Sequence, residues 1–142
     1  MEIYRLNDEL SSKTDTNILR ITDIRQAVKN PERVNVFVNG KYSFSLDVAQ
    51  LVDLKLKVGT EISEEELMEY KKASEFGKLY QRTLEWVLVR PRSIKEAKDY
   101  LYKKIHEKKL EKDYLNSIIE KLESKNYLDD LRFAEWYAEN RF

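Results

Sequence analysis

Two kinds of hydrophobic spacing divide the chain into an amino-terminal and a carboxy-terminal part. Between residues 18 and 46, β-branched and other apolar residues tend to alternate with polar ones, which is typical of strands that bury one face. From residue 64 onwards, apolar residues recur every three or four positions, as along one face of a helix. The pattern predicts an α+β chain: a small three-stranded antiparallel β module, an all-α three-helix repeat and the first helix of a second repeat.

The β module is predicted from a strand within 18–28 and a hairpin centred on Asn39 and Gly40. The apolar residues of the hairpin all stand at even positions: Val34, Val36, Val38, Tyr42, Phe44 and Leu46. A two-residue loop would pair Val38 with the polar Lys41, which breaks the match between the two apolar faces. We therefore predict a three-residue loop with a bulge, in which Gly40 has a positive φ angle.

Helix starts are predicted where Asp or Ser is followed three residues later by Gln or Glu, because these pairs form capping boxes. The pairs are Asp47 with Gln50, Ser63 with Glu66, and Ser93 with Glu96. The first pair begins a short helix over 47–54. The second begins one or two helices over 64–89, which Pro91 stops. The third opens a helix whose apolar stripe comprises Ile94, Ala97, Leu101 and Ile105.

Two further helices complete the predicted pattern. One covers 112–124, with an inward face made of Tyr114, Leu115, Ile118, Ile119 and Leu122. The other begins at Asp129 or Asp130, whose carboxylates suit a helix N-terminus, and contains Phe133, Trp136 and Tyr137.

An internal repeat is indicated by matches between the helix near residue 85 and the last helix. Arg82, Glu85 and Trp86 recur as Arg132, Glu135 and Trp136, each 50 positions later. The predicted organisation is a flexible arm at 1–17 that includes a short strand at 2–6, a β module at 18–62, and a helical region at 63–142, with a first repeat over about 75–128 and the start of a second at 129–142.

Composition narrows the class of protein. The formal net charge is zero, so the chain as a whole does not have the charge of a nucleic-acid-binding protein. Residues 71–112 nevertheless carry 13 basic and 6 acidic side chains, a local excess of 7. The chain has no cysteine, no apolar run long enough to span a membrane and no secretory signal at its start, so we predict no membrane association and a cytoplasmic location.

The cationic middle of the chain supplies the candidate binding residues. They are Arg82, Arg90, Arg92, Lys95, Lys98, Lys103, Lys104, Lys108, Lys109 and Lys112. Such a set can form an ordinary solvated helix face, because charged residues usually lie in water. It can also form a basic face that contacts DNA phosphates or acidic groups of a protein partner. The sequence leaves these alternatives open.

Aromatic residues at helical spacing could stack on bases, but they more commonly fill the core of a helical repeat. The aromatic residues concerned are Tyr80, Trp86, Tyr100, Tyr102, Tyr114, Tyr127, Trp136 and Tyr137. We predict Trp86 in the core. Trp136 is predicted to be exposed or to pack on another copy of the chain, because the helices that would cover it in a second repeat are absent from the sequence.

No pattern in the chain predicts catalysis. The single histidine, His106, is surrounded by lysines and is predicted to be an ordinary surface residue, and the pair Asp129 and Asp130 is predicted to cap a helix rather than to bind a metal. With three glycines in all, the sequence has no phosphate-binding loop. We therefore predict no enzyme, no cofactor and no metal.

Two segments carry a family resemblance: Arg90-Pro-Arg-Ser-Ile-Lys-Glu-Ala-Lys-Asp-Tyr-Leu-Tyr-Lys-Lys104 and Asn126-Tyr-Leu-Asp-Asp-Leu-Arg-Phe-Ala134. Both resemble segments of the RecX family of regulators of the RecA recombinase. The β segment is similar to the amino-terminal region of longer members, so the resemblance covers residues 18–142. It implies a small module joined to tandem three-helix repeats, which lodge in the groove of a RecA filament on single-stranded DNA and depress strand exchange and ATP hydrolysis. Members usually carry about three repeats, so we expect this chain to be a fragment of a longer one.

The functional prediction is a non-catalytic regulator that binds RecA–DNA filaments and inhibits them, acting in DNA repair and contacting single-stranded DNA only indirectly or weakly. Two alternatives remain. One is direct binding of single-stranded nucleic acid through the basic residues. The other is a protein-interaction scaffold that uses the edge of the β module.

Overall fold

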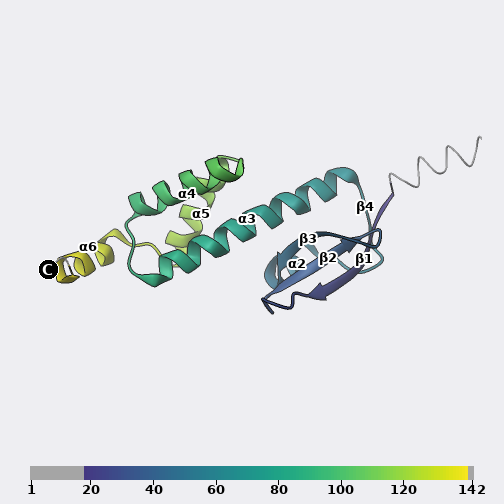
Figure 1. The fold of residues 1–142 in the computed structure, drawn as a ribbon, viewed down its shortest axis with the longest axis horizontal. Helices are drawn as coiled ribbons and strands as arrows, with labels where there is room; N and C mark the ends of the chain where they lie inside the picture. Colours follow the sequence, from purple (N-terminus) through teal and green to yellow (C-terminus); the bar gives the residue numbers. More distant parts are fainter. Residues whose placement is uncertain (1–17, 141–142) are drawn as a thin grey trace, which may run out of the picture. The chain divides into compact units, whose positions relative to one another are not determined.

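The computed structural model describes residues 18–140, and within this range four strands and five helices follow one another along the chain. The predicted arm at 1–17, with its strand at 2–6, lies outside the described residues. The elements are β1 (Leu19–Gln26), β2 (Arg33–Val38), β3 (Lys41–Asp47), α2 (Val48–Leu54), β4 (Glu61–Ile62), α3 (Glu64–Val89), α4 (Ile94–Lys108), α5 (Asp113–Ser124) and α6 (Asp130–Asn140) (Figure 1). The α+β class is confirmed.

The chain forms two compact units that divide between Gly77 and Lys78, within α3. The first unit contains the sheet, α2 and the start of α3, because Leu67, Tyr70 and Ala73 of α3 pack against the core of the sheet. The second unit contains the rest of α3 with α4, α5 and α6. The sequence analysis placed all of 63–142 in the helical region, whereas the structure groups residues up to Gly77 with the sheet.

The sheet has four antiparallel strands in the order β3-β2-β1-β4, one more than predicted. The additional strand, β4, pairs Ile62 with Leu19, and backbone hydrogen bonds around Ile21 continue this edge: Ile21 N donates to Thr60 O at 2.9 Å and Gly59 N donates to Ile21 O at 2.7 Å. A strand of two residues is too short to show alternation in the sequence, which is why the pattern missed it.

The hairpin between β2 and β3 corrects the predicted loop. Val38 pairs directly with Lys41, so the loop has two residues, Asn39 and Gly40, with φ angles of 51° and 82°. Both positive angles are typical of the type I′ turn, which suits the twist of a hairpin. The positive φ of Gly40 was predicted correctly, but the three-residue loop was wrong.

The apolar residues Val36 and Phe44 still pair as predicted, because the extra residue lies inside the strand β3 instead of in the loop. Val36 pairs with Phe44 whereas Phe37 pairs with Tyr42, so Ser43 is the extra residue of a bulge. Beyond this bulge the side-chain alternation reverses. Tyr42 therefore joins Phe37, on which it packs edge to face at 6.2 Å, and is half exposed instead of lying in the core.

The predicted capping box of α2 is confirmed and also connects α2 to α3. Gln50 N donates to Asp47 Oδ1 at 2.6 Å, and Asp47 N donates to Gln50 Oε1 at 3.1 Å. The same Gln50 side chain donates from Nε2 to the backbone oxygen of Ala73 in α3 at 2.8 Å. It lies directly against Gly77, where a Cβ atom would come within 2.7 Å of Gln50 Oε1.

We predict that Gly77→Ala lowers the free energy of unfolding by about 1 kcal/mol, although alanine is the better helix former by about 1 kcal/mol. The new methyl group would displace the Gln50 side chain, which then loses bonds to Asp47 and Ala73 worth about 1 kcal/mol each. Urea unfolding followed by circular dichroism measures the change.

The control is the same substitution in a Gln50→Ala background. There the methyl group meets no side chain at position 50, so Gly77→Ala is expected to stabilise the protein by about 1 kcal/mol. Equal effects of Gly77→Ala in both backgrounds would show that the close approach of Gln50 does not explain the glycine.

The core of the second unit is formed by one face from each of three helices. The capping boxes at Ser63 and Ser93 are confirmed, and residues 64–89 form a single helix. The buried side chains are Leu79, Tyr80, Thr83 and Val87 of α3, Ala97, Leu101 and Ile105 of α4, and Tyr114, Ile118, Ile119 and Leu122 of α5. The predicted faces of α4 and α5 are thus confirmed, except that Ile94 and Leu115 are half-buried.

The two adjacent carboxylates before α6 have separate structural roles. Asp129 Oδ1 accepts hydrogen bonds from Leu131 N at 2.9 Å and from Arg132 N at 3.3 Å, so it caps α6. Asp130 Oδ1 accepts from Ile94 N at 2.8 Å, which ties the start of α6 to the start of α4. The predicted helix start and capping role are confirmed.

Candidate partner-binding surface

Four basic side chains from two helices gather on one side of the second unit. Lys78 and Arg82 lie one turn apart on α3, and Lys104 and Lys108 lie one turn apart on α4. The pKa of Lys108 is lowered by partial burial and by the positive charges of Arg82, Lys104 and Lys78, against which Glu107 acts in the opposite direction. Arg82, Lys104 and Lys78 are thus near enough to Lys108 to act on its charge, and we call the four residues the α3–α4 cation cluster.

Stacked aromatic rings hold α3 and α4 together beside this cluster. The rings of Trp86 and Tyr100 are 4.3 Å apart between centroids and nearly parallel, at 12°. Lys104 Nζ lies 5.6 Å from the centroid of the Tyr100 ring, and Arg82 is near enough to lower the pKa of Tyr100, against the larger raising effect of burial. The stacking therefore fixes the helix pair that presents the cations.

The cluster is not neutralised by the part of the chain that the structure describes. Over residues 18–140, no ion pair involves Lys78, Arg82, Lys104 or Lys108. In contrast, Lys103 lies 4.0 Å from Glu107 on the same helix. Four cations that form no ion pair in this range make a surface that favours phosphate or carboxylate groups of another molecule.

Arg92, a predicted binding residue, instead holds the end of α3. Its Nε and Nη2 atoms donate to the backbone oxygen of Trp86 at 3.2 and 3.1 Å, and its guanidinium carbon lies 4.1 Å from the centroid of the Trp86 ring. The arginine thus satisfies a carbonyl group at the helix end that has no partner within the helix. Its position is explained by the fold alone.

Arg90 is also engaged within its own unit. It donates from Nη2 to Glu96 Oε2 at 2.6 Å and from Nη1 to the backbone oxygen of Pro91 at 2.7 Å, and it lies over the Trp136 ring at 4.8 Å. Burial raises the pKa of Glu96, but hydrogen bonds from Arg90 and Ser93 and the positive charges of Arg90 and Arg92 bring it below its ordinary value. The ion pair is therefore formed at neutral pH.

We predict that Arg92→Leu lowers the free energy of unfolding by about 2 kcal/mol, because a helix-end carbonyl loses a charged double donor and the Trp86 ring loses its cation. Arg92→Lys is expected to cost about 1 kcal/mol, because an ammonium group cannot reproduce the planar fork. Urea unfolding followed by tryptophan fluorescence measures both changes.

The matched control is Lys95→Leu, since Lys95 is exposed at the start of α4. Its effect is expected to stay within about 0.5 kcal/mol. An equally small effect at Arg92 would contradict the structural role assigned to that residue.

The other predicted binding residues do not join the cluster. Lys95 and Lys98 are exposed on the first turns of α4, and Lys109 and Lys112 are exposed around the turn between α4 and α5. The predicted set therefore separates into arginines that hold the helix ends, the α3–α4 cation cluster, and lysines on other surfaces. Lys78 was missed, although its spacing to Arg82 matches that of Lys104 to Lys108.

Both tryptophans occupy half-buried positions. Trp86 is half-buried between α3 and α4 and is not part of the core, so its predicted core position was wrong. The core position on that face is taken by Val87, which is 4% exposed. Trp136 is half-buried against Phe133, 6.1 Å away between ring centroids, and beneath Arg90.

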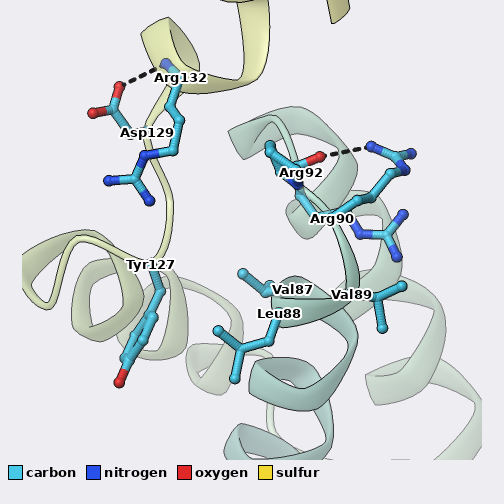
Figure 2. A pocket seen from close by; sticks show the side chains of 9 residues that line it. Val87, Leu88, Val89, Arg90, Arg92, Tyr127, Asp129 and Arg132 are labelled. Carbon is cyan, nitrogen blue, oxygen red and sulfur yellow. Dashed lines mark hydrogen bonds between the residues drawn. The ribbon is translucent and has the colours of Figure 1, made fainter. Parts of the chain in front are cut away.

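A pocket of about 280 Å³ separates the end of α3 from the start of α6 (Figure 2). Val87, Leu88 and Val89 come from the end of α3. Tyr127 and Asp129 come from the segment that leads into α6, and Arg132 comes from α6 itself. Asp129 is already engaged in capping α6, as the dashed line to Arg132 in Figure 2 shows. The pocket thus combines two exposed aliphatic side chains, Leu88 and Val89, with arginines.

Within residues 18–140, no group of three or more histidine and acidic side chains is placed to hold a metal ion. None of the helices in this range is long and apolar enough to cross a membrane. His106 is exposed, as predicted, and its ring packs parallel to that of Tyr102 at 6.3 Å.

Comparisons with known proteins agree with this architecture. The regulatory protein RecX N-terminal domain matches residues 19–63. The regulatory protein RecX of Bacillus pumilus is 38% identical over 118 residues, which cover 83% of this chain and 43% of that protein. The corresponding protein of Listeria monocytogenes is 35% identical over 123 residues, covering 87% of this chain and 44% of that protein.

A solved structure extends the agreement to both units. A crystal structure of regulatory protein RecX matches with a TM-score of 0.70 at 26% identity, covering 85% of this chain and 57% of that chain. The chain spans less than half the length of the curated relatives that it matches. Over the part that it shares with those proteins, the chain belongs to the RecX family of regulatory proteins.

Proposed function

We propose that the chain is a non-catalytic regulator that binds filaments of a RecA-type recombinase on single-stranded DNA and lowers their ATPase and strand-exchange activity. Family membership supports a regulatory role. The observation that carries the contact itself is the α3–α4 cation cluster, whose four side chains have no ion-pair partner over residues 18–140. A protein-coated DNA filament offers both phosphate and carboxylate groups to such a surface.

The cluster supplies attraction, and the rigid helix pair supplies spacing. Because the Trp86–Tyr100 stack joins α3 to α4, the two pairs of cations keep a fixed separation and lose little conformational freedom on binding. Each cation that neutralises a DNA phosphate releases counterions, which makes binding weaken steeply with salt. Contacts to protein carboxylates also weaken with salt, but they require the recombinase.

The test is co-sedimentation of the chain with RecA filaments assembled on single-stranded DNA, compared with the same DNA alone. We expect the chain to enter the filament pellet and to lower the rate of ATP hydrolysis. Binding to the DNA alone is expected to be at least about tenfold weaker, because four phosphate contacts without stacked bases give only modest affinity.

Two outcomes would contradict the proposal. Equal affinity for naked DNA and for the filament would favour the alternative function, a direct single-stranded nucleic-acid-binding protein. Absence of the chain from the filament pellet at low salt would show that the part of a RecX protein to which this chain corresponds does not bind the filament. The interaction scaffold based on the sheet edge would be favoured if residues 18–62 were required for binding and the cluster were not.

A further inference from the structure

A second surface of the helical unit has the chemistry of a peptide-binding site, separate from the α3–α4 cation cluster. A hollow of about 580 Å³ opens where α4 ends and α5 begins. Its apolar lining comes from Ile105, Leu110 and Leu115. Ile105 is buried, whereas Leu110 and Leu115 are half-buried and leave part of their side chains open to a ligand.

The turn that shapes the hollow is fixed by the backbone. Lys109 ends α4 in the left-handed conformation with a φ angle of 55°, and Leu110 N donates to Ile105 O at 3.0 Å. This αL ending is a common helix C-cap, here made by a lysine instead of glycine. It directs the chain sharply into α5 and keeps the Leu110 side chain in the hollow.

The rim of the hollow is basic. Lys109, Lys112 and His106 line it, and both lysines are exposed. Over residues 18–140, neither lysine forms an ion pair, and the nearby acidic residues Glu111 and Asp113 are not among the lining side chains. An apolar floor with unneutralised cations around it complements an acidic segment that carries an apolar side chain.

The lining favours a polypeptide over nucleic acid. Proteins that bind single-stranded DNA hold its bases mainly by stacking them on aromatic side chains. Here the floor is aliphatic, and the two rings of the lining, those of Tyr102 and His106, are parallel to each other at 6.3 Å between centroids and lie outside that floor. The volume of about 580 Å³ is that of a pocket for a small ligand or a few side chains.

We propose that the hollow between α4 and α5 binds an acidic segment of a partner protein, with one leucine or phenylalanine side chain inserted between Ile105, Leu110 and Leu115 and flanking carboxylates placed on Lys109 and Lys112. This inference goes beyond the proposed function, because it concerns different residues and a different class of contact. The hollow can be occupied whether or not the cation cluster binds a filament.

The experiment is fluorescence anisotropy of the full chain with a labelled short peptide in which one leucine is flanked by glutamates. We expect saturable binding of the leucine peptide. Replacing the leucine by alanine is expected to weaken binding at least about tenfold, because the shorter side chain leaves the apolar floor of the hollow exposed to water. Lys109→Glu with Lys112→Glu is expected to weaken binding at least about tenfold. The matched control is Lys95→Glu with Lys98→Glu, which makes the same charge change on the exposed start of α4.

The outcomes separate the proposal from its rivals. Loss of affinity in the Lys109 and Lys112 variant but not in the control, together with dependence on leucine, supports it. Equal binding of the alanine peptide, equal loss in both variants, or no saturable binding of the leucine peptide overturns it. Displacement of the peptide by oligothymidylate at equal concentration would assign the hollow to nucleic acid and also overturn it. Circular dichroism of each variant checks that the helices remain folded.

Discussion

Simultaneous replacement of Lys78, Arg82, Lys104 and Lys108 by glutamate is expected to lower the affinity of the chain for a RecA filament by about a hundredfold or more. Each replacement removes an attraction and adds a repulsion, so a change of under about 1 kcal/mol at each position is enough. The fold is expected to survive, because these side chains form no ion pair in the described residues and four glutamates repel one another no more than the four cations that they replace. Quantitative co-sedimentation measures the affinity.

The control variant carries the same change in net charge on the first unit. Lys29, Lys41, Lys55 and Lys57 are all exposed there, and their replacement by glutamate changes the total charge equally. Its affinity is expected to fall by less than about fivefold, since these lysines are not part of the proposed contact surface and salt weakens the general effect of net charge. Similar losses in both variants would show that net charge, and not the cluster, controls binding.

A second comparison asks which of the sequence-predicted lysines take part. Replacement of Lys95, Lys98 and Lys103 by glutamate tests exposed positions of α4 outside the cluster. If the filament contact lies at the cluster, this variant retains most of its affinity. A larger loss of affinity in this variant than in the cluster variant would place the contact surface at these other positions of α4.

The sequence predicted the helical unit well because its signals are local. Capping boxes act within four residues, and the apolar stripe of α4 is a property of one helix, so neither depends on how the chain packs elsewhere. The buried residues Ala97, Leu101 and Ile105 were therefore identified correctly. The same holds for Asp129 and Asp130, whose place before a helix defines their capping role.

The β module was harder to predict because pairing joins residues far apart in sequence. Alternation required Val36 to face Phe44, and the structure satisfies this pairing. The sequence could not show where the extra residue would lie, since a bulge at the loop and a bulge at Ser43 give the same pairing beyond it. Asn39 and Gly40 favour a two-residue turn strongly enough to place the bulge within the strand.

The binding surface could be predicted only in part, because it depends on which faces of two helices meet. The basic residues of α4 could be recognised in the sequence. Whether Lys104 and Lys108 lie near Lys78 and Arg82, however, depends on how α3 and α4 pack. Arg92 has a structural role that its charge alone does not reveal. Its place after a helix end gives it a carbonyl group to satisfy.

Leu101→Ala is expected to produce the largest loss of stability, about 3 kcal/mol. Leu101 is fully buried in the α4 face, with Ala97 and Ile105 one turn away on either side. Truncation removes apolar burial and leaves a cavity that helices in contact can close only partly. Such a loss is a large share of the free energy of unfolding of a typical native protein, which is roughly 5–15 kcal/mol.

Tryptophan fluorescence during urea unfolding measures this loss in the helical unit specifically, because both tryptophans of the chain, Trp86 and Trp136, lie beyond Gly77. The matched control is Leu88→Ala, the same truncation at a side chain that is 62% exposed. Its effect is expected to stay below about 1 kcal/mol, since little apolar area leaves water there in the folded state. Equal shifts of the two unfolding midpoints would mean that α4 does not pack into a shared core with α3 and α5, and the fixed spacing of the α3–α4 cation cluster would then lose its physical basis.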